Sequence, residues 1–114
     1  MTGTDESMGP VFAALADPTR RRLLELLGSS PESSATSLAT QLPVSRQAIV
    51  QHLAVLDAAG LVASRRVGQQ VLFRVRPGTL AVAASWLADR AGAWQRSLRA
   101  LKDAAEAHYG SDTE

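Results

Sequence analysis

The chain of 114 residues contains no cysteine, which excludes disulfides, iron–sulfur clusters and thiolate metal sites. Aromatic residues make up only 4%, and no apolar run approaches the roughly 20 residues that a membrane-spanning helix needs. The first ten residues are polar and acidic, whereas a secretory signal starts basic and becomes apolar. We therefore expect a cytoplasmic protein without membrane association.

Catalytic residue sets are also missing. No serine–histidine–aspartate set, carboxylate pair or glycine-rich phosphate loop stands in a suitable context, so the sequence argues against an enzyme. With only two histidines, His52 and His108, neither a transition-metal site nor another cofactor is expected. His52 falls on the apolar side of its predicted helix, where a hydrogen-bonded structural role is the simpler interpretation.

Positive charge is concentrated in the middle of the chain, although the formal net charge is only +1. Residues 20–76 hold eight arginines against three acidic residues, a balance of +5. The remaining residues hold four basic against eight acidic side chains, a balance of −4. A basic segment between acidic ends favours a partner that carries phosphates.

Length predicts one domain, which we place at residues 9–109, with flexible tails at 1–8 and 110–114. Hydrophobic periodicity and turn residues predict four helices, a β-hairpin and a last long helix, a fold class that is mainly helical with a small β-hairpin. The expected elements are helices at about 10–16, 18–28, 38–42 and 46–59, strands at 61–67 and 71–76, and a last helix at about 79–108.

The residues around the fourth helix form a helix-turn-helix pattern. Pro43 ends the short helix before it, Ser45 is a good N-cap, and Gly60 closes the helix over 46–59. The strands that follow flank Gly68, which suits the turn of a hairpin.

The fourth helix has one apolar side and one polar side. Its apolar residues can bury against the preceding helix, whereas its opposite side is polar or small and carries no acidic group that would repel phosphate. Arginine can bond guanine twice, glutamine can pair with adenine, and valine can touch the thymine methyl group. A merely solvated face is the alternative, but the basic hairpin that follows favours DNA.

An apolar stripe with alternating spacings of four and three residues runs along the last helix for four heptads. At roughly 45 Å this helix is longer than so small a domain can cover, and a soluble monomer rarely exposes such a patch. We therefore predict a helix–helix dimer seam, with residues near the N-terminus packing against it. The alternative, in which the helix folds back on its own domain, suits only its first turns. The predicted dimerisation residues are Val11, Phe12, Leu15, Leu87, Ala91, Trp94, Leu98, Leu101 and Ala105.

Three segments resemble the ArsR/SmtB-type winged helix-turn-helix transcriptional regulators: FAALADPTRRRLLELL, LPVSRQAIVQHLAVLDAAGLV and RRVGQQVLFRV. The resemblance covers roughly residues 11–107. The spacing of Trp86 and Trp94 is similar to that of a subgroup often encoded beside cup-shaped lipid- or polyketide-binding proteins. The resemblance implies a homodimer that represses transcription by occupying a palindromic operator in double-stranded DNA, often at its own promoter.

The same resemblance assigns DNA contacts to residues of the fourth helix and of the hairpin. Many family members carry a small hydroxyl residue where this chain has Val50, which leaves the base preference at that position open. The implied DNA-contacting residues are Ser45, Arg46, Gln47, Val50 and Gln51 in the helix and Arg65, Arg66, Gln69 and Gln70 in the hairpin wing.

Three questions stay open at this point. A dimeric adaptor that no longer binds DNA is one alternative function, and a metal-responsive sensor that uses His108 is another. An effector, either a small molecule or a protein, stays unidentified. Trp86 and Trp94 can serve as packing residues or line a ligand pocket.

Overall fold

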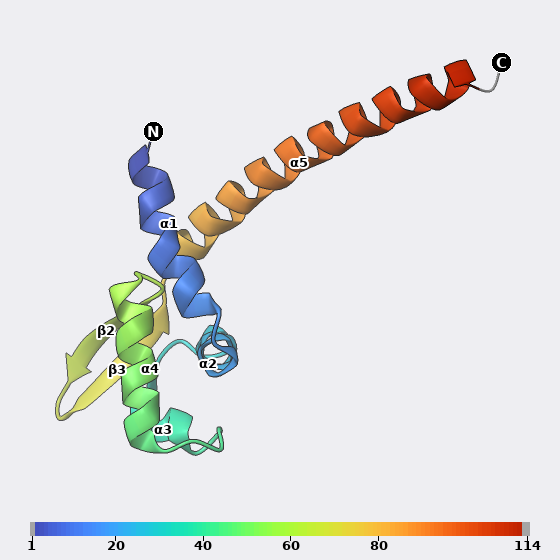
Figure 1. The fold of residues 1–114 in the computed structure, drawn as a ribbon. Coiled ribbons are helices and arrows are strands. Elements are labelled where there is room, and N and C mark those ends of the chain that lie inside the picture. The colour runs from blue at the N-terminus through green and yellow to red at the C-terminus, as the bar shows by residue number, and fades with distance from the viewer. Residues whose placement is uncertain (1, 113–114) are drawn as a thin grey trace. The chain divides into compact units, whose positions relative to one another are not determined.

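The structure is a computed structural model that describes the backbone of residues 2–112 and the side chains of residues 8–107 (Figure 1). The chain divides into two compact units, an N-terminal unit that extends to Leu80 and a C-terminal unit that starts at Ala81. The elements in chain order are α1 (Thr2–Leu15), α2 (Pro18–Gly28), β1 (Ser33–Ser34), α3 (Ala35–Ala39), α4 (Arg46–Ala58), β2 (Val62–Val67), β3 (Gln70–Val75) and α5 (Pro77–Asp112).

Helix caps in the N-terminal unit form where turn chemistry predicts them. The Asp17 side chain accepts a hydrogen bond from the Arg20 backbone N–H (3.0 Å) at the start of α2. The Ser45 hydroxyl likewise accepts from the Ala48 N–H (3.1 Å) at the start of α4. Gly60, just beyond α4, has a φ of +77°, a conformation that glycine adopts without strain. These caps fix both ends of α4 and thereby its length.

The sheet has three antiparallel strands in the order β1-β3-β2. The predicted hairpin is confirmed: β2 and β3 pair from Val62 opposite Val75 to Val67 opposite Gln70, and Gly68 lies between them. The third strand, β1, falls between the expected helices at 18–28 and 38–42, where the sequence analysis predicted no strand. Only two residues long and without β-branched side chains, it has no alternation to reveal it and is defined by its pairing with β3.

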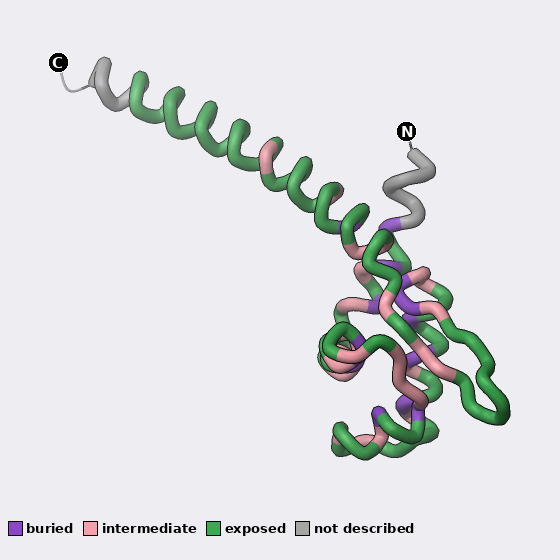
Figure 2. The backbone as a smooth tube through the Cα atoms, turned by 180° about the vertical axis from the view of Figure 1, so that it is seen from behind, coloured by how far each residue is buried: buried purple, intermediate pink, exposed green. Residues whose placement is uncertain are grey.

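The hydrophobic core of the N-terminal unit forms where α2, α3, α4 and the start of β2 meet. The inward positions predicted for α4, Ile49, Leu53 and Leu56, are confirmed as fully buried. Figure 2 shows the buried positions gathered in this unit, whereas almost every described position of α5 beyond its first turns is exposed. The side chains that fill the core are Leu23, Leu27, Leu38, Ile49, Leu53, Leu56, Leu61 and Val62.

The first and last helices are longer than the sequence indicated. Helix α1 starts at Thr2 and contains Pro10 in its interior. An interior proline removes a hydrogen-bond donor and usually kinks or ends a helix, which is why the sequence favoured a start at Pro10. Helix α5 starts at Pro77, where a first-turn proline is tolerated, and reaches Asp112. Residues 2–8 lie in α1 and residues 110–112 lie in α5. In the described part of the chain, no helix has the length and apolar character to cross a membrane.

Candidate nucleic-acid interface

One face of α4 presents the predicted base-reading side chains to solvent. Arg46, Gln47, Val50 and Gln51 are all exposed, whereas Leu53 on the opposite face is fully buried. The helix phase that the sequence predicted is thus the phase in the structure. This face contains donors, acceptors and one methyl-bearing side chain, which is the chemistry that base edges in the major groove can meet.

Arg46 is tied to the preceding helix. Its Nε donates a hydrogen bond to the hydroxyl oxygen of Thr36 on α3, at 3.0 Å. Among the described residues, no hydrogen bond is found for its two terminal nitrogens. The bond therefore orients the guanidinium while leaving donors for a base or a phosphate.

A groove of about 280 Å³ separates the start of α4 from the tip of the hairpin. Arg46 and Val50 line it from α4, and Gln69 and Gln70 line it from the hairpin. The structure thus brings together four of the predicted DNA-contacting residues, from two elements about twenty residues apart in the sequence. Phe73 of β3 forms part of the apolar wall.

The two wing arginines lie on opposite faces of the hairpin. In the register of the sheet, Arg65 stands opposite Leu72 and Arg66 stands opposite Val71. Because side chains alternate along a strand, Arg66 shares the face of Val71 and Phe73, which line the groove, and Arg65 points to the other face. The sequence interpretation treated these two arginines as equivalent, and the structure separates them.

Arg65 forms a two-pronged ion pair with Glu32, a residue that the sequence analysis did not single out. Nε of Arg65 donates to one carboxylate oxygen at 2.6 Å, and a terminal nitrogen donates to the other at 2.7 Å. These hydrogen bonds, with smaller help from the charges of Arg65 and Arg74, lower the pKa of Glu32. The same pair raises the pKa of Arg65. The two residues are 33 positions apart, so no local sequence signal connects them.

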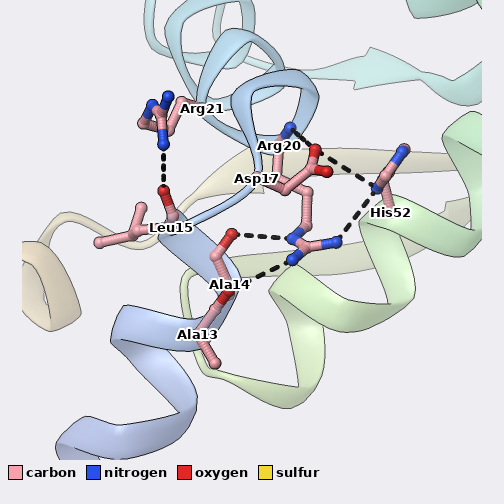
Figure 3. Close-up of polar contacts among 7 residues, drawn as sticks. All are labelled: Ala13, Ala14, Leu15, Asp17, Arg20, Arg21 and His52. Atoms are coloured by element: carbon pink, nitrogen blue, oxygen red, sulfur yellow. Dashed lines mark hydrogen bonds and ion pairs between the residues drawn. The ribbon is translucent and has the colours of Figure 1, made fainter.

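Arg20 connects three helices of the N-terminal unit (Figure 3). It donates through Nε to the Ala14 carbonyl (2.8 Å) and through a terminal nitrogen to the Ala13 carbonyl (3.2 Å), at the end of α1. Its other terminal nitrogen lies 3.3 Å from Nδ1 of His52 on α4. Since an arginine can only donate, Nδ1 acts as the acceptor. The predicted structural role of His52 is confirmed.

Two arginines of the basic segment are thus occupied inside the fold. Besides Arg20, Arg21 donates to the Leu15 carbonyl at 2.7 Å (Figure 3). The carbonyls at the end of a helix lack partners within it and carry partial negative charge, so these cations stabilise the end of α1. Asp17 beside them has a lowered pKa, chiefly because its carboxylate accepts the Arg20 backbone N–H. Counting arginines in the sequence therefore overstated the charge available to a phosphate-bearing partner.

The predicted dimerisation residues divide into an exposed and a partly buried group. On α5, Trp94 and Leu101 are each 68% exposed, and Leu87, Ala91, Leu98 and Ala105 are exposed as well. On α1, Val11 is only 2% exposed within the single chain, so little of its side chain is left for a partner. Phe12 and Leu15 are half-buried.

The C-terminal unit also holds an aromatic contact. The Arg90 guanidinium lies over the half-buried Trp86 ring, 4.5 Å from its centroid, in a cation–π arrangement. In the part of the chain that the structure describes, no group of three or more histidine, cysteine or acidic residues could hold a metal ion. The side chain of His108, considered above for a metal sensor, lies outside the described residues.

Proteins that are similar to this chain are named as transcriptional regulators. Residues 15–65 match the model of a family described as "Helix-turn-helix domain". The chain is 41% identical over 95 residues to an HTH-type transcriptional regulator of Mycobacterium tuberculosis, which covers 83% of this chain and 85% of that protein. It is 31% identical over 80 residues to the transcriptional repressor SdpR of Bacillus subtilis, which covers 70% of this chain and 88% of the repressor.

A solved structure agrees with these relatives. The ArsR-like transcriptional regulator from Rhodococcus sp. RHA1 is 46% identical and superposes with a TM-score of 0.79, over 89% of this chain and 94% of that one. These proteins are named as regulators and not as enzymes, in agreement with the missing catalytic residues. The chain therefore belongs to the ArsR/SmtB-type family of winged helix-turn-helix transcriptional regulators.

Proposed function

We propose that a homodimer of this chain binds a palindromic operator in double-stranded DNA and represses transcription there. The observation that carries the proposal is the exposed face of α4 from Arg46 to Ala54, which carries no acidic side chain and lies beside the tip of the wing. In the proposed complex α4 enters the major groove, and Gln47, Val50 and Gln51 contact base edges.

Contacts to the DNA backbone come from the start of α4 and from the wing. The Ser45 hydroxyl oxygen caps α4, which leaves its O–H hydrogen as a donor to a phosphate. Arg46 reaches a phosphate or a guanine with its terminal nitrogens. Arg66, Gln69 and Gln70 extend the contact along the wing.

The exposed stripe of α5 supports the dimer. Leu87, Trp94, Leu98 and Leu101 are half or more exposed, which is unusual for a monomer but suits a seam between two helices. Phe12 and Leu15 of α1 supply further apolar area. Two-fold symmetry places two α4 helices about 34 Å apart, one turn of DNA, so that each reads one half of a palindrome.

Repression follows from the same geometry, because a dimer seated on a promoter excludes other proteins from it. A curated relative is named as a transcriptional repressor, which favours repression over activation. The regulated promoter can include the chain's own. An effector that releases the dimer is compatible with this proposal, and either a small molecule or a protein partner fits it.

Selection of bound sequences from random duplexes tests the proposal. We expect a palindrome with half-sites one helical turn apart. Replacing Gln51 by alanine is expected to reduce discrimination between that operator and random DNA by about 1–3 kcal/mol. A matched control is Ala54→Ser, a small change further along the same exposed face.

The adaptor alternative gives a different result. A protein that has lost DNA binding selects no sequence and shows no affinity that falls with salt. Selection of a single, non-repeated site would contradict the two-fold arrangement.

A further inference from the structure

The pair between Glu32 and Arg65 crosses the whole sheet. Ser34 of β1, Leu72 of β3 and Arg65 of β2 stand in one row across the three strands, because Leu72 pairs with both neighbours. Glu32, two residues before Ser34, lies on the same side by strand alternation. Its carboxylate therefore reaches over the middle strand to grip the guanidinium on the far one.

The two partners differ in their exposure to solvent. The Glu32 side chain is 19% exposed and the Arg65 side chain 60%. Both carboxylate oxygens are taken by one guanidinium, the bidentate geometry in which such pairs are strongest. Glu32 is thus the more buried partner, and the exposed Arg65 side chain is oriented toward it. Arg66, the neighbouring cation, forms no ion pair with any residue in the described part of the chain.

We propose that Glu32 tunes the affinity for DNA by withholding Arg65 from DNA phosphates. The inference rests on the DNA binding proposed above. A cation releases counterions from DNA only to the extent that its charge is free, and the carboxylate offsets that charge. Arg66 then supplies the wing's phosphate contact, and non-specific affinity stays lower than the arginine count of the wing implies.

The consequence concerns affinity for DNA of any sequence. Phosphate contacts carry no sequence information and strengthen binding to every duplex alike. An acid that neutralises one such contact lowers the affinity for operator and random DNA by the same factor, and it leaves the exposed face of α4 unchanged. Glu32 thus sets how tightly and how salt-dependently the protein holds any duplex, while discrimination between sequences stays with α4.

The test measures non-specific binding of the full chain to a random-sequence duplex by fluorescence anisotropy, between about 50 and 200 mM salt. For Glu32→Gln we expect a slope of log affinity against log salt that is steeper by about 0.9 per protomer, and binding that is tighter by about tenfold per protomer near 0.1 M. Glu25→Gln is the matched control, since it removes the same charge from another acid–arginine pair on α2. It is expected to stay near the wild-type slope.

Variants of the two wing arginines test whether the steeper salt dependence of Glu32→Gln depends on the Arg65 guanidinium. Arg66→Gln is expected to flatten the slope, because no carboxylate among the described residues pairs with that cation. In the double variant Glu32→Gln with Arg65→Gln, the slope is expected to return to the wild-type value. A purely structural role for the pair predicts a weaker wing and looser binding in the Glu32 variant, with no return in the double variant.

Several outcomes overturn the inference. One is a Glu32→Gln slope equal to that of Glu25→Gln. Another is a double variant whose slope stays as steep as that of Glu32→Gln alone. If the Glu32 variant unfolds, an unchanged slope in Arg66→Gln overturns the inference, because Arg66 is the cation of the wing that the proposal leaves free for phosphate. If the wild-type protein binds DNA and these results appear, only this inference fails. If the wild-type protein shows no salt-dependent DNA binding, the proposed function fails with it.

Discussion

The two units of the chain treat their large apolar side chains in opposite ways. None of the leucines of the N-terminal unit is exposed, and six of its twelve, including Leu53 at 0% exposure, are buried. The C-terminal unit leaves Leu87, Trp94, Leu98 and Leu101 in solvent. The N-terminal unit covers its own apolar core, whereas α5 needs a partner surface to cover its apolar side. Folding of the N-terminal unit therefore depends on one chain, and burial of the apolar side of α5 depends on a second.

The helices of the two units also differ in length. Side chains of Asp17, Ser34 and Ser45 cap helices of 5 to 13 residues in the N-terminal unit. Helix α5 spans 36 residues. Most of the stability of a protein helix comes from packing of its apolar side, so α5 depends on a surface that covers that side.

The largest effect is expected in the core of the N-terminal unit. Leu53→Ala removes a fully buried side chain and leaves a cavity, which should lower the free energy of unfolding by about 2–5 kcal/mol. Urea unfolding followed by circular dichroism measures this change. The matched control is Val55→Ala on the same helix, where an exposed side chain should give less than about 0.5 kcal/mol. Equal losses in the two variants would show that α4 does not bury the face assigned here.

A second variant addresses the exposed unit. Trp94→Ala is expected to weaken dimerisation by about 2 kcal/mol or more, roughly thirtyfold in the dissociation constant, because large aromatic side chains dominate such interfaces. Sedimentation velocity over a dilution series measures it. Arg96→Ala, on the opposite side of α5 by helix phase, is the control and should leave the dissociation constant unchanged. A wild-type protein that stays monomeric at high concentration would contradict the assignment of the α5 stripe as a dimer interface.

The smallest expected effect concerns pH. The pKa of Asp17 is lowered in the folded chain, so its ionised form stabilises the fold. That contribution is fully present above the ordinary pKa of an aspartate, about 4, and is lost as the pH falls through the lower folded value. Asp17→Asn keeps a capping oxygen but cannot ionise. The difference in Tm between wild type and this variant should shrink below about pH 4, and a constant difference would contradict the assigned role.

Much of the interface could be predicted from the sequence because its signals are local. The cap at Ser45, the helix phase that buries Leu53 and exposes Gln51, and the turn at Gly68 all depend on residues within a few positions of one another. Periodicity and turn chemistry are local rules, so they work where local chemistry decides the structure. The same rules identified the exposed stripe of α5.

The features that the sequence analysis did not predict depend on contacts between residues far apart in the chain. Strand β1 forms only because β3 passes beside it, and the bond from Glu32 to Arg65 spans 33 positions. The sequence counted eight arginines as one basic segment, yet Arg20 and Arg21 cap α1 and Arg65 is paired. A charge count does not say which cations are already bound, and only three-dimensional placement supplies that knowledge.

The contact that Arg20 makes with α1 and His52 has a consequence for signalling within the N-terminal unit. One guanidinium holds the last carbonyls of α1 and the imidazole on the buried side of α4. A subunit or ligand that pulls α1 out of place has to break these bonds, and the base-reading helix then loses a brace on its inner side. A displacement of α1 can thus be transmitted to α4 through a single side chain.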